Sequence, residues 1–183
     1  MEGKPVPYSV FRKRVRDESI GGDNPFKWVD IETKDVFLGN RVLVFALPGA
    51  FTPTCSTYQV PDFVEQREAI KALGVDAIYV LSVNDTFVMR KWLIDLGAED
   101  KIDFLPDGAA EFTKGMDMLV DLSAIGFGKR SRRYAMIVDN GIVEKMFIEP
   151  EYTEEDPDPY GVSSAESVLT YLRSTSATNR LTK

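Results

Sequence analysis

Residues 42–55 read Val-Leu-Val-Phe-Ala-Leu-Pro-Gly-Ala-Phe-Thr-Pro-Thr-Cys, and the expected fold is organised around them. The first six are mostly branched or aromatic apolar residues, which are typical of a buried central strand. Thr52 and Pro53 then predict a helix start, because a hydroxyl residue suits the N-cap and proline suits the first helical position. Cys55, the only cysteine, would lie in the first turn. Free backbone N–H groups and the helix dipole favour a reactive thiolate there.

The segments that follow predict an α/β fold. Residues 54–73 have helix-forming composition with apolar positions largely on one side, and Gly74 is a natural end for that helix. Residues 76–83 read as a second buried strand. A strand, a helix and a strand in this order suggest a right-handed parallel βαβ unit. Ligand chemistry in such sheets lies near the carboxyl ends of the strands, where the loop before Cys55 falls.

Farther along the chain, the pattern predicts two more helices and a hairpin. Asn84-Asp85 can cap the first of these helices, and Ser163-Ser164-Ala165-Glu166 forms a capping box for the last one. Asn140-Gly141, between two apolar runs, is a strong hairpin signal. We expect the C-terminal end to fray from about Ser174. No repeat or linker divides the sequence, so we expect one domain over residues 1–183.

Two clusters of charge have plain structural interpretations. Residues 9–17 hold four basic residues, but the apolar residues between them favour an edge strand with a solvated face over a nucleic-acid patch. Residues 149–158 hold six carboxylates, which could suggest a calcium loop. The EF-hand spacing and its glycine are missing, however, and prolines interrupt the segment. A solvated loop is the better prediction.

Composition excludes several classes of function. Lys plus Arg number 22 and Asp plus Glu 29, and the resulting net charge of −7 argues against nucleic acid as a partner. No apolar stretch approaches the roughly 20 residues that span a bilayer, and the first residues lack a signal-peptide pattern. We therefore expect a cytoplasmic protein with no membrane partner. One cysteine and no histidine exclude an internal disulfide, Cys-His catalysis and a histidine-based zinc site. We expect no metal and no cofactor.

Three motifs, in the expected order, resemble the peroxiredoxins and in particular their peroxiredoxin 5 (type II) branch. Residues 48–55 are similar to the active-site loop of that family, whose pattern is Pro-x-x-x-Thr-x-x-Cys. Residues 81–85 (Leu-Ser-Val-Asn-Asp) and 132–134 (Arg-Arg-Tyr) are also similar to that branch. The resemblance covers roughly residues 8–173. It implies a thioredoxin-like fold, in which helices flank a central mixed β-sheet.

The resemblance also implies roles for the site residues. Cys55 would be the peroxidatic cysteine, and Arg133 the cation that holds the thiolate and polarises the peroxide. Thr52 would hydrogen-bond the thiolate and the peroxide, while Pro48 would shield the sulfur from solvent. The backbone N–H groups of Thr54 and Cys55 are further candidate donors to the substrate. Each residue also has a structural explanation, as a cap, a turn former, a surface ion-pair partner or a small core thiol.

The lone cysteine decides the expected catalytic cycle. Reduction of hydrogen peroxide or a small alkyl hydroperoxide would leave a Cys55 sulfenic acid, and the chain holds no second thiol to resolve it. The resemblance suggests an external thiol reductant, either glutathione with glutaredoxin or thioredoxin. Many relatives have a histidine shortly after the cysteine, where this chain has Tyr58-Gln59. Relatives often form homodimers through loops around the site, and Phe51 and Phe87 are candidate contacts.

Two other functions can be weighed against the same residues. A redox sensor or binding module on this fold would be oxidised at Cys55 without efficient turnover. A thioredoxin-like disulfide reductase would need Cys-x-x-Cys, and Thr52 occupies the partner position here. That second alternative is therefore disfavoured.

Overall fold

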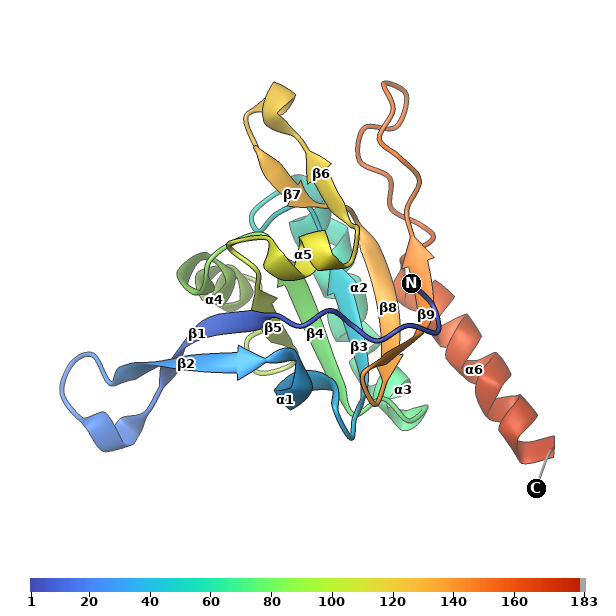
Figure 1. Cartoon of the computed structure of the whole chain (residues 1–183), viewed down its shortest axis with the longest axis horizontal. Coiled ribbons are helices and arrows are strands. Elements are labelled where there is room, and N and C mark those ends of the chain that lie inside the picture. Colours follow the sequence, from blue (N-terminus) through green and yellow to red (C-terminus); the bar gives the residue numbers. More distant parts are fainter. Residues whose placement is uncertain (182–183) are drawn as a thin grey trace.

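The computed structural model describes the backbone of residues 1–181 and the side chains of residues 1–176 (Figure 1). Its centre is a five-stranded sheet in the order β5-β4-β3-β8-β9. Three neighbouring strands, β5, β4 and β3, are parallel, whereas β8 runs antiparallel to β3 and β9 antiparallel to β8. The sheet is therefore mixed, as predicted. Its strands are β3 (Arg41–Ala46), β4 (Ala77–Ser82), β5 (Asp103–Pro106), β8 (Tyr134–Asp139) and β9 (Ile142–Ile148).

Helices cover both faces of the sheet (Figure 1), because successive side chains of β3 point into two different apolar layers. Leu43 and Phe45 belong to one buried cluster, and Val42, Val44 and Ala46 to the other. The predicted α/β architecture is thus confirmed. The first layer is completed by α2 (Val60–Glu65), α3 (Arg67–Ala72), α4 (Thr86–Asp95) and α6 (Ala165–Leu181), and the second by α1 (Thr33–Phe37) and α5 (Glu111–Gly115).

Local signals in the sequence set several boundaries correctly. The Asp85 carboxylate accepts hydrogen bonds from the backbone N–H groups of Phe87 and Val88 at 2.8 and 3.0 Å, and so caps α4. Asn140 and Gly141 have positive φ angles of 47° and 81°, as the two-residue turn between β8 and β9 requires. The last helix also begins where expected. Its first turn is capped by the Ser164 hydroxyl, which accepts from the Ser167 N–H at 3.3 Å, and by the Asp62 carboxylate, which accepts from the Ala165 N–H at 2.9 Å.

The helix predicted over residues 54–73 is interrupted, and this part of the prediction is wrong. Residues Cys55–Gln59 form a π-helical turn in which the Val60 N–H bonds to the Cys55 carbonyl. Pro61 follows within the first turn of α2. A proline inside a helix cannot donate to the carbonyl four residues earlier and crowds it, so the wider turn relieves the conflict. A second break at Gln66 separates α2 from α3.

Two small antiparallel ribbons lie outside the central sheet (Figure 1). The first pairs β1 (Val10–Arg16) with β2 (Phe26–Glu32), so the basic segment near the N-terminus is a strand, as expected. Lys13 of this ribbon is almost completely buried and forms an ion pair with Asp103 of β5 at 2.5 Å. The second ribbon, β6 (Leu119–Asp121) with β7 (Lys129–Ser131), has no counterpart in the sequence prediction.

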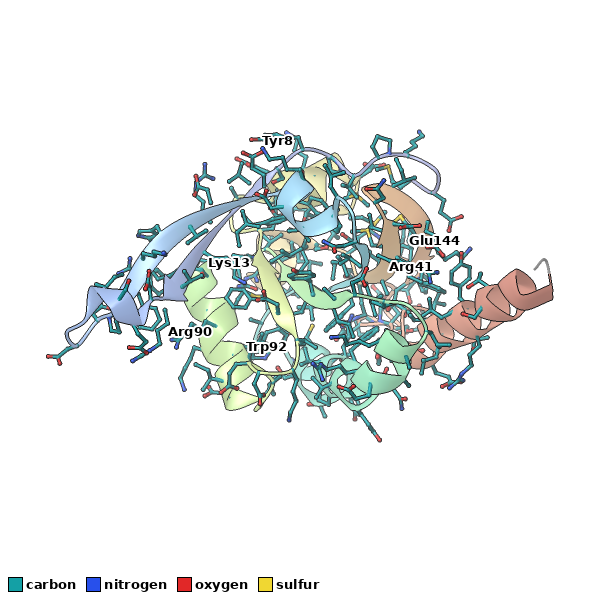
Figure 2. All side chains as sticks on the ribbon, turned by 90° about the horizontal axis from the view of Figure 1, so that it is seen from below. Tyr8, Lys13, Arg41, Arg90, Trp92 and Glu144 are labelled. Carbon is teal, nitrogen blue, oxygen red and sulfur yellow. The ribbon has the colours of Figure 1, made fainter. Side chains whose placement is uncertain are left out.

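The C-terminal helix is held to the edge of the sheet by a polar cluster. Arg41 of β3 makes two hydrogen bonds to Glu144 of β9, at 2.6 and 2.8 Å (Figure 2). Tyr171 of α6 donates to the same carboxylate at 3.1 Å. The helix continues to Leu181, so the expected fraying from about Ser174 is wrong up to that point, and residues 182–183 lie outside the described part of the chain. Within the described residues, no helix has the length and apolar character needed to cross a membrane.

Candidate active site

Cys55 lies at the carboxyl end of β3, after the loop of residues 47–54. Helical backbone begins at Pro53, so the thiol occupies the first turn, as predicted. The Ser56 N–H bonds to the Thr52 carbonyl at 3.1 Å, which makes Thr52 a cap through its backbone. The Thr52 hydroxyl does not make the expected capping bond but donates to the Gly49 carbonyl at 2.7 Å. The Cys55 side chain is free of disulfides and fully buried.

The end of β4 holds this loop in place. The side-chain oxygen of Asn84 accepts from the Ala50 N–H at 3.0 Å and from the Ser82 hydroxyl at 2.6 Å. Between Ala50 and Thr52, Phe51 adopts a left-handed φ of 64°, a conformation that is uncommon for a bulky residue. Asn84 belongs to the motif at residues 81–85. Its hydrogen bond to the Ala50 N–H shows how that motif contacts the loop before Cys55.

Loss of the Asn84 side chain should loosen the loop. Asn84→Ala leaves the N–H of the buried Ala50 without its acceptor, which costs about 1–3 kcal/mol. We expect urea unfolding to show that loss. Asn84→Asp keeps an acceptor at the same place and should retain most of the stability. An unchanged unfolding free energy in the alanine variant would contradict this role.

Arg133 reaches the sulfur because of the register of the sheet. Ala46 pairs with Tyr134, so the residue before β8 lies beside the loop that follows β3. The Nη1 atom of Arg133 lies 3.4 Å from the Cys55 sulfur. This guanidinium is also buried, with 1% of the residue exposed. The structure thus brings together the cysteine and the arginine that the sequence singled out, at hydrogen-bonding distance.

Two further side chains hold the guanidinium. Nη1 also donates to the side-chain oxygen of Gln59, and Nη2 forms an ion pair with Asp158. The Nε donor is buried and has no hydrogen-bond partner among the described residues. Burial by itself lowers the pKa of Arg133, but the negative charges of Cys55 and Asp158 outweigh it and hold that pKa above its ordinary value. The site is therefore a buried charge centre in which the Nε donor is unpaired within the described part of the chain.

Pro48 and Thr54 are near the sulfur in sequence, but they have different surroundings. Pro48 is buried, and its carbonyl accepts from Arg130 Nη1 at 3.4 Å. The guanidinium of Arg130 also lies over the ring of Phe127, at 5.4 Å from its centroid. Thr54 is half-buried, and its hydroxyl makes no capping bond to the turn that follows. Pro48 is thus a buried member of the loop before Cys55, whereas Thr54 is half-buried at the start of the turn that carries the thiol.

Sequence reasoning missed Asp158 as a neighbour of the site. It lies in the acidic segment predicted to be a solvated loop, and the prediction fails for two of the six carboxylates there. Asp158 pairs with Arg133, and Glu149 is 3% exposed. Nothing in the local pattern separates these two from the exposed members of the segment. Gln59 stands where many relatives have a histidine, and its amide can both donate and accept hydrogen bonds. The structure places it in the core, where its Nε2 donates to the Ala46 carbonyl at 3.2 Å and its oxygen accepts from Arg133.

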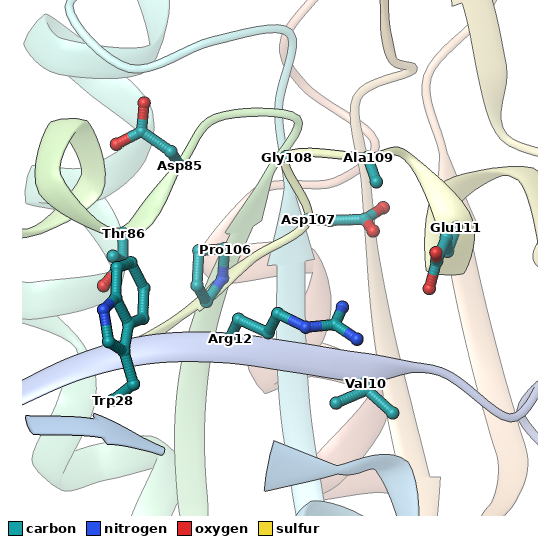
Figure 3. Close-up of a pocket in the computed structure, with 10 residues that line it drawn as sticks. All are labelled: Val10, Arg12, Trp28, Asp85, Thr86, Pro106, Asp107, Gly108, Ala109 and Glu111. Atoms are coloured by element: carbon teal, nitrogen blue, oxygen red, sulfur yellow. The ribbon is translucent and has the colours of Figure 1, made fainter. Parts of the chain in front are cut away.

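A cavity of about 250 Å³ elsewhere in the molecule does not involve the thiol (Figure 3). It lies between β1, β2 and the segments that begin α4 and α5. Two of its carboxylates already serve as helix caps. Asp85 caps α4, and Asp107 accepts from the N–H groups of Phe112 and Thr113 at 3.1 and 2.8 Å. Burial raises the pKa of Asp107. These contacts explain the carboxylates structurally and leave the Cys55 site as the functional candidate.

The guanidinium beside the Cys55 sulfur, at the carboxyl end of a central strand, is the arrangement expected of a thiol-based redox site. The Redoxin family profile matches residues 27–169. A peroxiredoxin from Synechocystis sp. is 52% identical over 173 residues, covering 94% of this chain and 91% of the relative. The chain belongs to the peroxiredoxins, which are thiol peroxidases, and within them to the peroxiredoxin 5 (type II) branch.

Solved structures agree with this assignment and with the thioredoxin-like fold. The antioxidant protein of Plasmodium falciparum, described as a 1-Cys peroxiredoxin, superposes with a TM-score of 0.84 at 34% identity and covers 94% of this chain and 99% of its own. Reduced Prx3 of Vibrio vulnificus, in complex with hydrogen peroxide, has a TM-score of 0.79 at 37% identity, with 94% and 98% covered. Both likenesses extend over nearly the whole chain.

Proposed function

We propose that this chain reduces hydrogen peroxide and small alkyl hydroperoxides by a single-cysteine cycle through Cys55. The observation that carries the proposal is the 3.4 Å contact between the Cys55 sulfur and Arg133, inside a buried site. A nearby cation favours the thiolate, which is the nucleophilic form of cysteine. The complete burial of the sulfur supports a small substrate, because a bulky hydroperoxide would have to displace more of the surrounding side chains.

In the oxidation step, the thiolate attacks one oxygen of the hydroperoxide. A sulfur–oxygen bond forms while the oxygen–oxygen bond breaks, so sulfur is oxidised to sulfenic acid and the peroxide is reduced. The second oxygen leaves as hydroxide or alkoxide and becomes water or an alcohol on protonation. The unused Nε donor of Arg133 could stabilise that developing charge. Since the Thr52 hydroxyl donates to Gly49, its oxygen remains available to accept from the hydroperoxide O–H. Pro48 would keep water from the sulfur.

In the reductive half of the cycle, an external thiol attacks the sulfenic sulfur and releases water. The resulting mixed disulfide is then cleaved by a second thiol, which restores Cys55. The presence of one cysteine in 183 residues supports this route, because the chain has no second thiol that could attack the sulfenic acid. The 1-Cys description of the Plasmodium falciparum relative supports it as well. We propose glutathione with glutaredoxin, or thioredoxin, as the reductant.

The remaining proposals concern the setting of the enzyme. We propose that residues 1–183 act as one domain in the cytoplasm and that two copies pair through the loops around the site. Phe51 and Phe87 support such pairing, since 54% and 58% of these large apolar residues are exposed.

Rapid mixing with hydrogen peroxide, followed by trials of different reductants, tests the proposal. We expect one sulfenic acid per chain after mixing, and continuous peroxide consumption once glutathione with glutaredoxin, or thioredoxin, is added. A dithiol reagent without those proteins is the control for general thiol reduction. Rapid oxidation with no turnover under any reductant would favour the redox sensor instead. Failure of peroxide to oxidise Cys55 would refute both functions.

A further inference from the structure

Asp158 is the only full negative charge, other than the sulfur, that contacts the Arg133 guanidinium within the described residues. Arginine stays protonated in proteins, so this site holds a positive charge at every stage of a reaction. A buried charge without an opposite charge is costly. Gln59, the third side chain bonded to the guanidinium, is neutral and cannot compensate it.

The charge on the sulfur, by contrast, changes during the proposed cycle. The thiolate is negative, whereas the sulfenic acid and the mixed disulfide are uncharged there. If the sulfur were the sole counter-ion, Arg133 would be buried and unpaired after each oxidation. We propose that Asp158 is the permanent counter-ion of Arg133, which keeps the guanidinium paired and in position while the sulfur is uncharged. This inference rests on the proposed function for its role in the cycle, but the ion pair can be tested separately.

Hydrogen bonds anchor both ends of the segment that carries Asp158, whose side chain is 38% exposed. On one side, Glu149 donates its backbone N–H to the Arg133 carbonyl at 3.1 Å. Its carboxylate accepts from the N–H groups of Gly161 and Ser163 at 2.7 Å each. The segment that carries Asp158 is thus tied at one end to Arg133 itself and at the other to the start of α6.

The other titratable groups near the guanidinium do not replace Asp158. Burial raises the pKa of Tyr152 to about 12, so this phenol is neutral at physiological pH. Burial, together with a 2.5 Å hydrogen bond to Asp62 of α2, also raises the pKa of Tyr160, whose ring lies 5.8 Å from Arg133 Cζ. The Asp62 carboxylate accepts from the Tyr160 hydroxyl and the Ala165 N–H. The Glu149 carboxylate accepts from the backbone N–H groups of Gly161 and Ser163 and from the Ser163 hydroxyl.

This arrangement has two opposing consequences for Cys55. Asp158 stabilises the forms with an uncharged sulfur, because it compensates the buried cation. Its own negative charge disfavours a second negative charge nearby, and therefore works against the thiolate. Asp158→Asn keeps a hydrogen-bond acceptor of the same shape but removes the charge. The variant should separate a counter-ion from a residue that merely orients the arginine.

The first test is a double-mutant cycle on stability. We compare urea unfolding of the wild type, Asp158→Asn, Cys55→Ser and the double variant, at a pH where the ultraviolet absorbance of the thiolate shows that Cys55 is ionised. Asp158→Asn should lower the unfolding midpoint more in the serine background, where no thiolate remains to pair with Arg133. Equal losses in both backgrounds would overturn the counter-ion role.

The second test follows thiolate absorbance against pH, with each matching Cys55→Ser protein as the baseline. Asp158→Asn should move the midpoint about one pH unit lower. An unchanged midpoint, or a higher one, would show that Asp158 only orients Arg133. Asp156→Asn, an exposed residue of the same segment, is the matched control and should change neither measurement. Neither test requires peroxide, so failure of the proposed peroxidase reaction would be seen separately in the consumption assay.

Discussion

Replacing Cys55 by serine is expected to reduce peroxide consumption to the rate of the thiol reductant alone. The described site offers no second sulfur, and the chain holds no other cysteine. A serine hydroxyl at the same position stays protonated at neutral pH and is a poor nucleophile without an adjacent base. The measurement is peroxide loss with the reductant that supports the wild-type enzyme.

The serine variant must fold for this result to be informative. Cys55 is fully buried, so urea unfolding of the variant is needed beside the assay. Thr57→Ala, a change at an exposed hydroxyl in the same π-helical turn, is the matched control and should consume peroxide at the normal rate. Turnover that persists in a folded serine variant would refute the role of the sulfur.

Replacing Arg133 by alanine should slow the oxidation of Cys55 by about 100- to 1,000-fold. This is the usual effect of removing one donor that stabilises developing charge in an enclosed site. The variant loses the contact to the sulfur at 3.4 Å together with the unused Nε donor. Stopped-flow measurement of sulfenic acid formation at several peroxide concentrations reports the second-order rate directly.

Arg133→Lys distinguishes charge from geometry. A lysine keeps the positive charge, but its single ammonium group cannot reproduce the planar fork that contacts Cys55, Gln59 and Asp158. We expect an intermediate rate. Arg12→Ala removes an exposed arginine of β1 and serves as the control. A lysine variant as fast as the wild type would mean that charge alone suffices, and an alanine variant as fast would remove Arg133 from the mechanism.

Features that depend on neighbouring residues could be predicted from the sequence. The apolar run of β3 and the turn at Asn140-Gly141 each carry a local physical cause, and the structure contains both. The one long helix expected after Cys55 is the informative failure. The helix predicted over residues 54–73 includes Pro61, whose missing N–H favours the wider turn beside the thiol.

The sequence alone determined that a lone cysteine lies in the first turn of a helix, after a buried strand, because composition and capping act over a few residues. Only the tertiary structure decided which charges surround the sulfur. Arg133 and Asp158 are 78 and 103 positions beyond Cys55, and strand register and a long loop bring them together. The chain holds 29 carboxylates, and only the fold brings Asp158 against the Arg133 guanidinium. The residues next to Asp158 in the sequence contain no signal for that contact.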